Sequence, residues 1–237
     1  MPRPRRLPGL CAEPRRGIHG IVIDATGEQT AGSASRVRVV LATHNAHKLR
    51  EFAAIIADRL PQVELVSYDG PEPVEDGVTF AENALIKARV AARHTGAVAL
   101  ADDSGIAVDV LGGAPGVFSA RWSGGHGDDA GNLALLLAQL GDVPDAHRGA
   151  RYVCCIALVR PEADGEPGEE RTVEGVWEGS LAREARGANG FGYDPAFVPD
   201  GSTLTAAELD PEVKNADSHR ARAFRAMVPT LQELLAE

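Results

Sequence analysis

The segment of residues 37–48, VRVVLATHNAHK, places a polar loop between a short apolar run and the start of a helix pattern. Four apolar residues predict a buried strand: Val37, Val39, Val40 and Leu41. Beyond Lys48, apolar residues recur at the spacing of one helix face: Leu49, Phe52, Ala53, Ile56 and Leu60. This strand–loop–helix unit indicates an α/β fold, in which polar chemistry collects at strand ends.

Strand and helix patterns continue along the rest of the chain. Further strands are expected near residues 63–66, 97–101, 151–159 and 172–179. The strand at 97–101 is expected to end at Asp102-Asp103. Helices are expected over 79–94, where Thr79 and Glu82 match a capping box, over 128–140, where Asp128 is the cap, and over about 218–235.

Composition favours one soluble globular domain. The chain has 237 residues, of which 44% are hydrophobic and 24% charged, enough for one large core that could be split into two lobes. Residues 1–36 are rich in Arg, Pro, Gly and Ser, so we expect a disordered tail or an over-called start before a domain at 37–237.

The cysteines and the apolar runs indicate a cytoplasmic protein. Three cysteines form neither a disulfide framework nor a pair with metal-ligand spacing. No uncharged apolar stretch is long enough to span a membrane, and the arginine-rich start lacks the apolar core of a secretory signal.

The net charge argues against a nucleic-acid partner. It is −10 at pH 7, and because residues 1–36 hold six arginines against three acidic residues, the remainder carries −13. Proteins that bind DNA or RNA normally present a net basic face. A small nucleotide needs only a few local cations.

The loop at Thr43–Lys48 is suited to phosphate. Backbone N–H groups at a helix start attract anions, Thr43 and Asn45 add neutral hydrogen bonds, and Lys48 adds charge. The alternative is that Thr43 or Asn45 only caps the helix. His44 and His47 lack the further ligands that a metal site would need.

Asp102-Asp103 predicts a metal site or a general base. Two adjacent carboxylates repel each other, and a bound cation or a raised pKa would relieve this. With Glu75 they form a plausible Mg²⁺ ligand set. The alternative is a turn in Asp-Ser-Gly. No Walker phosphate loop is present.

The C-terminal third holds aromatic and basic residues suited to a base. Phe191-Gly192-Tyr193-Asp194 could stack on a base, although a turn with a core Phe is the stronger explanation for this segment taken alone. Lys214, His219 and Arg220 could be a solvated face, with Ser218 as a helix cap. The chain has only three lysines among 24 basic residues, and two of them, Lys48 and Lys214, fall in these segments.

Six motifs, in this order along the chain, resemble those of the inosine/xanthosine triphosphate pyrophosphatase family. They are VVLATxNxxK (39–48), TFxENAxxKA (79–88), ADDSG (101–105), GGAPGVxSAR (112–121), GFGYDP (190–195) and SHR (218–220). The resemblance, which covers residues 37–237, implies a two-lobed α/β fold with a long mixed β-sheet flanked by helices and a central active-site cleft. It also implies a homodimer and Mg²⁺-dependent hydrolysis of dITP, ITP and XTP to the monophosphate and pyrophosphate, which cleanses the nucleotide pool.

The resemblance also implies roles for single residues. Glu75 and Asp103 would bind Mg²⁺ with support from Asp102, and Asp103 would accept the proton of the attacking water. The other residues would contact the substrate: Thr43, His44, Asn45, Ala46, His47 and Lys48 at the triphosphate, Ser104, and Phe191, Gly192, Tyr193, Asp194, Lys214, His219 and Arg220 at the base. Two departures fall in these loops, since many family members have glycine at the positions of His47 and Ala221.

Two other functions fit parts of the pattern. A related pyrophosphatase for methylated or pyrimidine triphosphates is disfavoured by Lys214 and the SHR motif. A nucleotide sensor without catalysis would not need a base, so the carboxylates at Glu75, Asp102 and Asp103 favour the enzyme.

Overall fold

The computed structural model describes residues 36–43, 48–49, 52–53, 56, 59–162 and 167–236. The chain divides into two units, Met1–Ala34 and Ser35–Glu237, and all described residues belong to the second. The predictions for residues 1–35 and for His44, Asn45, Ala46 and His47 lie outside the described residues.

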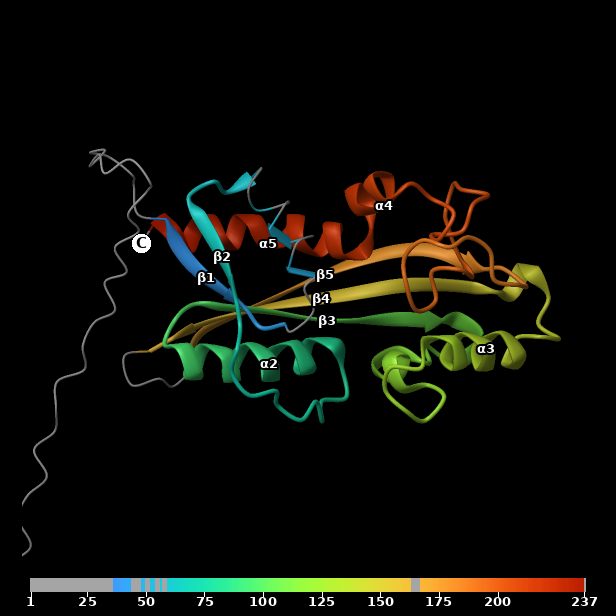
Figure 1. Cartoon of the computed structure of the whole chain (residues 1–237), viewed down its shortest axis with the longest axis horizontal. Coiled ribbons are helices and arrows are strands. Elements are labelled where there is room, and N and C mark those ends of the chain that lie inside the picture. Colours follow the sequence, from blue (N-terminus) through green and yellow to red (C-terminus); the bar gives the residue numbers. More distant parts are fainter. Residues whose placement is uncertain are drawn as a thin grey trace, which may run out of the picture. The chain divides into compact units, whose positions relative to one another are not determined.

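A six-stranded mixed sheet is the centre of the second unit (Figure 1). Its order is β2-β1-β3-β4-β5-β6, with β2 and β3 parallel to β1 and every later pair antiparallel. The strands are β1 (Val37–Leu41), β2 (Val63–Ser67), β3 (Ala99–Val108), β4 (Gly149–Pro161), β5 (Pro167–Leu181) and β6 (Phe197–Pro199). The predicted α/β class with a long mixed sheet is confirmed.

The helices start where their caps were predicted. In α2 (Phe80–Thr95), Thr79 and Glu82 form the complete capping box, and in α3 (Asp129–Gln139) the Asp128 side chain accepts a hydrogen bond from Gly131 N. Two helices end the chain, α4 (Pro211–Asp217) and α5 (His219–Ala236). Short 3₁₀ turns are η1 (Asp109–Leu111), η2 (Gly116–Arg121) and η3 (Asp145–His147).

The last helix and its cap at Ser218 agree with the sequence prediction, but the region before it differs. One helix was expected from Ser218, with Lys214 before it or on it, but Lys214 lies on the separate helix α4. Ser218 has an extended backbone between the two helices, and its Oγ accepts a hydrogen bond from Ala221 N. Ser218 interrupts the helical conformation, so Lys214 and His219 lie on two separate helices.

Helices cover both faces of the sheet (Figure 1). α5 packs on one face together with the helical residues that follow Lys48, where Phe52 and Phe224 are 5.2 Å apart between ring centroids. α2 packs on the other face through small buried side chains, including Ala84 and Ala88. Because strand residues alternate between faces, Leu100 joins the α5 side and Ala101 joins the α2 side.

The strand at 97–101 was predicted too short. β3 continues through Asp102 and Asp103 to Val108, and it pairs with β4 from Ala99↔Val159 to Val108↔Ala150. The long antiparallel partner supplies ladder hydrogen bonds that hold polar residues extended, which no local pattern reveals. The Asp-Ser-Gly turn that competed with a functional explanation is therefore absent.

Among the described residues, no helix is both long and apolar enough to cross a membrane.

Candidate active site

The sheet has a switch point beside β1. From β1 the chain goes to β2 on one side and returns to β3 on the other. β1 pairs with β3 only at Val40 and Leu41, so β3 continues beyond the end of β1. Crevices at the carboxyl ends of strands at such a point are the usual ligand sites of α/β sheets.

A polar cavity of about 220 Å³ lies at this place. Its lining brings together residues from segments far apart in the chain: Ala42, Thr43, Lys48, Tyr68, Glu72, Pro73, Glu75, Lys87 and Asp102. Thr43, Lys48, Glu75 and Asp102 were predicted from the sequence, and the structure gathers them around one space. We call this cavity the phosphate end, because the sequence analysis expects the triphosphate at Thr43 and Lys48.

Asp102 is paired with Lys48. The residue is 2% exposed, and its carboxylate accepts a hydrogen bond from Lys48 Nζ at 2.9 Å. Burial would raise the pKa of Asp102, but Lys48, Arg220 and Lys87 outweigh burial and lower that pKa below its usual range. Asp102 therefore stays ionised and holds the Lys48 ammonium at the cavity.

Asp103 points to the other face of the sheet, because neighbouring residues of a strand alternate. Its Oδ1 accepts a hydrogen bond from Lys87 Nζ at 3.2 Å, and Lys87 Nζ is also 3.3 Å from Glu75 Oε1. Burial raises the pKa of Asp103, and Glu75 adds to the rise against the opposing effect of Lys87. The two adjacent aspartates thus do not form a facing dyad, since each has its own lysine.

Lys87 is a site residue that the sequence analysis did not select. Burial alone would lower its pKa, but Asp103, Asp102 and Glu75 outweigh burial and raise it, so the side chain stays charged. The scarcity of lysine was a signal that could have found it. All three lysines of the chain contact a carboxylate in this structure: Lys48, Lys87 and Lys214.

The carboxylates of Glu75 and Asp103 fit a magnesium ion. In the described part of the chain, no three His, Cys, Asp or Glu side chains gather as a metal site. Magnesium is nevertheless commonly held by only one or two carboxylates together with waters and substrate phosphates. Glu75 and Asp103 converge on one cation, the Lys87 ammonium, so their oxygens are already arranged around a positive charge.

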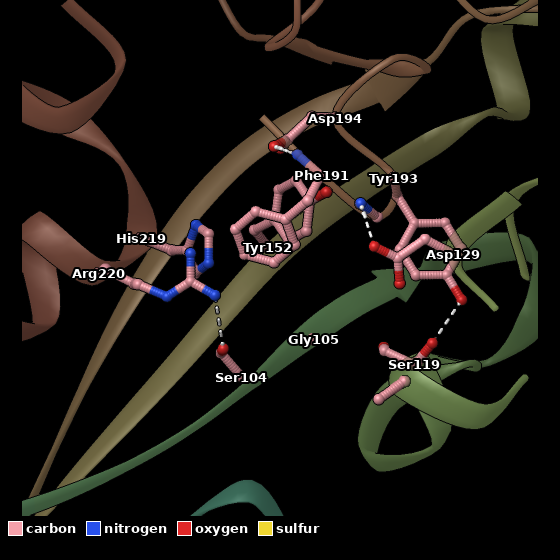
Figure 2. A pocket seen from close by; sticks show the side chains of 12 residues that line it. Ser104, Gly105, Ser119, Asp129, Tyr152, Phe191, Tyr193, Asp194, His219 and Arg220 are labelled. Carbon is pink, nitrogen blue, oxygen red and sulfur yellow. Dashed lines mark hydrogen bonds between the residues drawn. The ribbon is translucent and has the colours of Figure 1, made fainter. Parts of the chain in front are cut away.

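A second cavity, of about 110 Å³, lies further along β3 (Figure 2). It is lined by Ser104, Gly105, Ser119, Ala120, Asp129, Tyr152, Phe191, Gly192, Tyr193, Asp194, His219 and Arg220. Ser104 and Asp102 lie on one face of β3, about 7 Å apart along the strand. Arg220 Nη2 donates a hydrogen bond to Ser104 Oγ at 3.3 Å. One strand therefore carries polar groups of both cavities.

Phe191 is the exposed aromatic of this cavity. Its ring is 48% exposed, with the Arg220 guanidinium carbon 5.2 Å and the Lys214 Nζ 5.8 Å from the ring centroid. An exposed ring beside two cations is suited to stacking on a base that carries acceptor groups.

Two side chains that were predicted to enclose a base, Asp194 and Tyr193, line this cavity and also hold the 190–194 loop in shape. Asp194 is 3% exposed, forms an ion pair with Lys214 Nζ and accepts a hydrogen bond from Phe191 N at 2.9 Å. Tyr193 OH donates a hydrogen bond to Ser119 O at 2.8 Å. Asp129, which the sequence analysis did not select, accepts a hydrogen bond from Gly192 N at 3.1 Å (Figure 2).

His219 is buried and neutral. Its ring stacks on Tyr152 with centroids 4.6 Å apart and planes 10° apart. Burial lowers the pKa of His219 well below its usual value, and Arg220, Lys214 and Lys48 lower it further. Its Nδ1 has no hydrogen-bond partner among the described residues. Tyr152, on β4, was not selected from the sequence because it lies in an ordinary apolar strand pattern.

Comparison with known proteins identifies relatives over nearly the same span. The model of the Ham1 family matches residues 39–230. A dITP/XTP pyrophosphatase of Leifsonia xyli subsp. xyli is 63% identical over 198 residues, which cover 84% of this chain and 97% of that protein. One of Streptomyces avermitilis is 56% identical over 202 residues, which cover 84% of this chain and 98% of that protein.

Solved structures agree with these matches. The HAM1 protein of Coxiella burnetii has a TM-score of 0.74 and 44% identity, over 83% of this chain and 99% of that chain. A nucleoside-triphosphatase, dITP/XTP pyrophosphatase, of Mycobacterium abscessus has a TM-score of 0.67 and 54% identity, over 81% of this chain and 100% of that chain.

Proposed function

This chain belongs to the Ham1 family, and from that premise we propose that it is a Mg²⁺-dependent pyrophosphatase for dITP, ITP and XTP. Its products would be the nucleoside monophosphate and pyrophosphate. One observation supports this most directly: β3 carries Asp102, which lines the polar cavity, Asp103, which contacts Lys87 of that cavity, and Ser104, which lines the aromatic cavity. A nucleotide lying along β3 would have its phosphates at the first cavity and its base at the second.

Glu75 and Asp103 would hold the magnesium ion, because their carboxylates already converge on the positive charge of Lys87. When bound there, the ion would supply positive charge to the triphosphate and to the pyrophosphate leaving group. Lys48, held by Asp102 at 2.9 Å, would contact a phosphate oxygen. Catalysis of this kind depends mainly on position and charge, and this end of the site supplies both.

Asp103 would be the general base. A water oxygen would attack the α-phosphorus, the bond from that phosphorus to the pyrophosphate would break, and the water proton would pass to Asp103. Before an ion is bound, burial raises the pKa of Asp103. Lys87, 3.2 Å from Asp103 Oδ1, would limit this rise and keep the carboxylate in place before the reaction.

Recognition of the base would rest on donors at the second cavity and beside its Phe191 ring. Lys214 and Arg220 flank Phe191 and can donate to an oxo group, whereas the 6-amino group of adenine would leave such donors unpaired. His219 is neutral, so it would offer one N–H donor and no charge.

Two further parts of the proposal come from the sequence analysis, the first from the family resemblance and the second from the cysteines. We propose a homodimer, which light scattering after size-exclusion chromatography would test. We also propose a cytoplasmic site of action, in keeping with the free thiols of Cys154 and Cys155.

The direct test is product analysis with ITP. The expected result is IMP and pyrophosphate in the presence of Mg²⁺, and neither after its removal with EDTA. Release of IDP and phosphate would contradict cleavage at the α-phosphorus. Binding of ITP with no product under any condition would favour a nucleotide sensor instead.

A further inference from the structure

Asn83, in the first turn of α2, joins two parts of the phosphate end. Its side chain is 1% exposed, and both ends of its carboxamide are hydrogen bonded. Nδ2 donates to Asp103 Oδ2 at 3.2 Å, and Oδ1 accepts from Gly77 N at 2.9 Å. The Asp103 carboxylate only accepts hydrogen bonds and Gly77 N only donates one. The Nδ2 end of the amide must therefore face Asp103, and the Oδ1 end must face Gly77.

The two partners of Asn83 belong to the two segments that carry the proposed magnesium ligands. Gly77 lies two residues after Glu75 in the loop before α2, and Asp103 is on β3. Lys87 is one turn further along α2 and therefore on the same side of the helix as Asn83. Together, Asn83 and Lys87 donate to both oxygens of Asp103.

The approach of the loop to Asn83 is too close for any residue but glycine at position 77. A Cβ atom at Gly77 would lie 2.6 Å from Asn83 Oδ1 and 2.8 Å from Glu82 Cβ. Both distances are shorter than carbon normally allows, so the backbone reaches the amide only because position 77 has no side chain.

The chemistry at position 83 requires a donor and an acceptor on one short side chain. Aspartate would place a second negative charge beside Asp103 and could not donate while ionised. Leucine has a similar branched shape but would leave Gly77 N and Asp103 Oδ2 without this partner. A carboxamide satisfies both at once.

We propose that Asn83 is a positioning residue of the active site, which holds the Asp103 carboxylate and the Glu75 loop in register for metal binding and catalysis. This inference rests on the proposed function. It assigns to Asn83 no contact with substrate. Partners that orient metal ligands typically affect metal affinity or activity by about 10–100-fold.

The test compares Asn83→Leu with Glu82→Ala. Glu82 is the neighbouring residue whose carboxylate accepts hydrogen bonds from Val78 N at 2.7 Å and Thr79 N at 3.2 Å, and it contacts none of the proposed ligands. Both variants weaken the start of α2, but only Asn83→Leu removes the donor to Asp103. The measurements are kcat and KM for ITP, the thermal midpoint, and binding of Mn²⁺ alone by electron paramagnetic resonance.

Asn83→Leu should lower kcat by about 10–100-fold with KM for ITP within about threefold, and it should weaken Mn²⁺ binding by about 10-fold or more. Glu82→Ala should lower the thermal midpoint and leave kcat and Mn²⁺ binding unchanged. If Asn83→Leu retains kcat within twofold of wild type, or if both variants lose activity only in proportion to stability, the positioning role is wrong.

A second variant covers the case in which Asn83→Leu does not fold. Gly77→Ala leaves the Asn83 side chain intact but displaces the loop, and it should also weaken Mn²⁺ binding. Unchanged Mn²⁺ binding in Gly77→Ala would overturn the link between the loop and Asp103. If the wild type released no pyrophosphate from ITP, the proposed function would fail, while the Mn²⁺ titrations would still decide the role of Asn83.

Discussion

Replacement of Arg148 by methionine should destabilise the fold strongly. The Arg148 side chain is 2% exposed and donates to three backbone carbonyls: Nε to Leu181 O at 2.7 Å, Nη1 to Leu140 O at 2.6 Å and Nη2 to Ala182 O at 2.7 Å. Leu140 caps the end of α3 and Leu181 ends β5. One guanidinium therefore ties a helix end to a strand end.

The magnitude follows from these three contacts. A hydrogen bond from a charged donor contributes about 1.5–3 kcal/mol, so three contribute at most about 9 kcal/mol. Methionine keeps most of the apolar stem, and water can hydrate part of the vacated space. We therefore expect a loss of about 4 kcal/mol, since each buried carbonyl left without a donor costs about 1–3 kcal/mol. For a domain of this size the thermal midpoint should fall by about 8–16 °C.

Urea unfolding measures this loss, followed by tryptophan fluorescence and far-UV circular dichroism. The matched control is Arg183→Met. Arg183 follows Ala182 in the chain, but its side chain is 55% exposed and its Nε is 2.7 Å from Asp145 Oδ1. The control should change stability by no more than about 1 kcal/mol. If Arg148→Met also stays within about 1 kcal/mol of wild type, with an unchanged m value, the assignment of Arg148 as a buried tie is refuted.

Three further predictions concern the active site. Asp103→Asn should lower kcat for ITP by about 10²–10⁴-fold with little change in melting temperature, because an amide accepts no proton; wild-type-like turnover would remove Asp103 from the mechanism. Wild-type kcat/KM should be at least ~100-fold higher for ITP and XTP than for ATP and GTP, a difference of about 2.7 kcal/mol in transition-state binding. Lys214→Ala should reduce the ratio of kcat/KM for ITP to kcat/KM for ATP. Equal hydrolysis of all four nucleotides by the wild type would contradict base recognition. Burial, then Arg220 and Lys214, lower the pKa of His219 in the folded state, so below about pH 6.5 only the unfolded chain takes up this proton. As the pH falls, the wild type should therefore lose stability by up to about 1.4 kcal/mol per pH unit more than His219→Gln does. Parallel curves of stability against pH for the two proteins would contradict a buried neutral His219.

Local chemistry accounts for the elements that were predicted well. The capping box of Thr79 and Glu82 and the cap at Asp128 are satisfied within a few residues of chain, and the structure confirms both. Errors arose where a distant partner decided the conformation. β3 was predicted to end at Asp102 because polar residues usually leave a buried strand, but pairing with β4 holds the polar residues extended.

The candidate site shows the same division. Polar residues with an unusual type or motif, such as Lys48, Asp103 and Lys214, were selected from the sequence. Asn83 and Tyr152 were not, because an asparagine in a helix and a tyrosine in an apolar strand are ordinary residues until their partners are known. Their partners, Asp103 and His219, are respectively 20 and 67 positions away in the chain.

By itself, the sequence determined the α/β class, the strand at Val37–Leu41 and the caps of α2 and α3, since periodicity, caps and residue type act over a few positions. It also predicted which short segments would carry phosphate, metal and base chemistry. Only the tertiary structure decided that Asp102 and Asp103 face opposite sides of the sheet, each with its own lysine, and that one strand joins the two cavities. The physical reason is that strand pairing and burial depend on residues brought together from distant parts of the chain. Those neighbours shift the pKa values of Asp102, Asp103 and His219 in the directions described, and residue type alone does not predict these shifts.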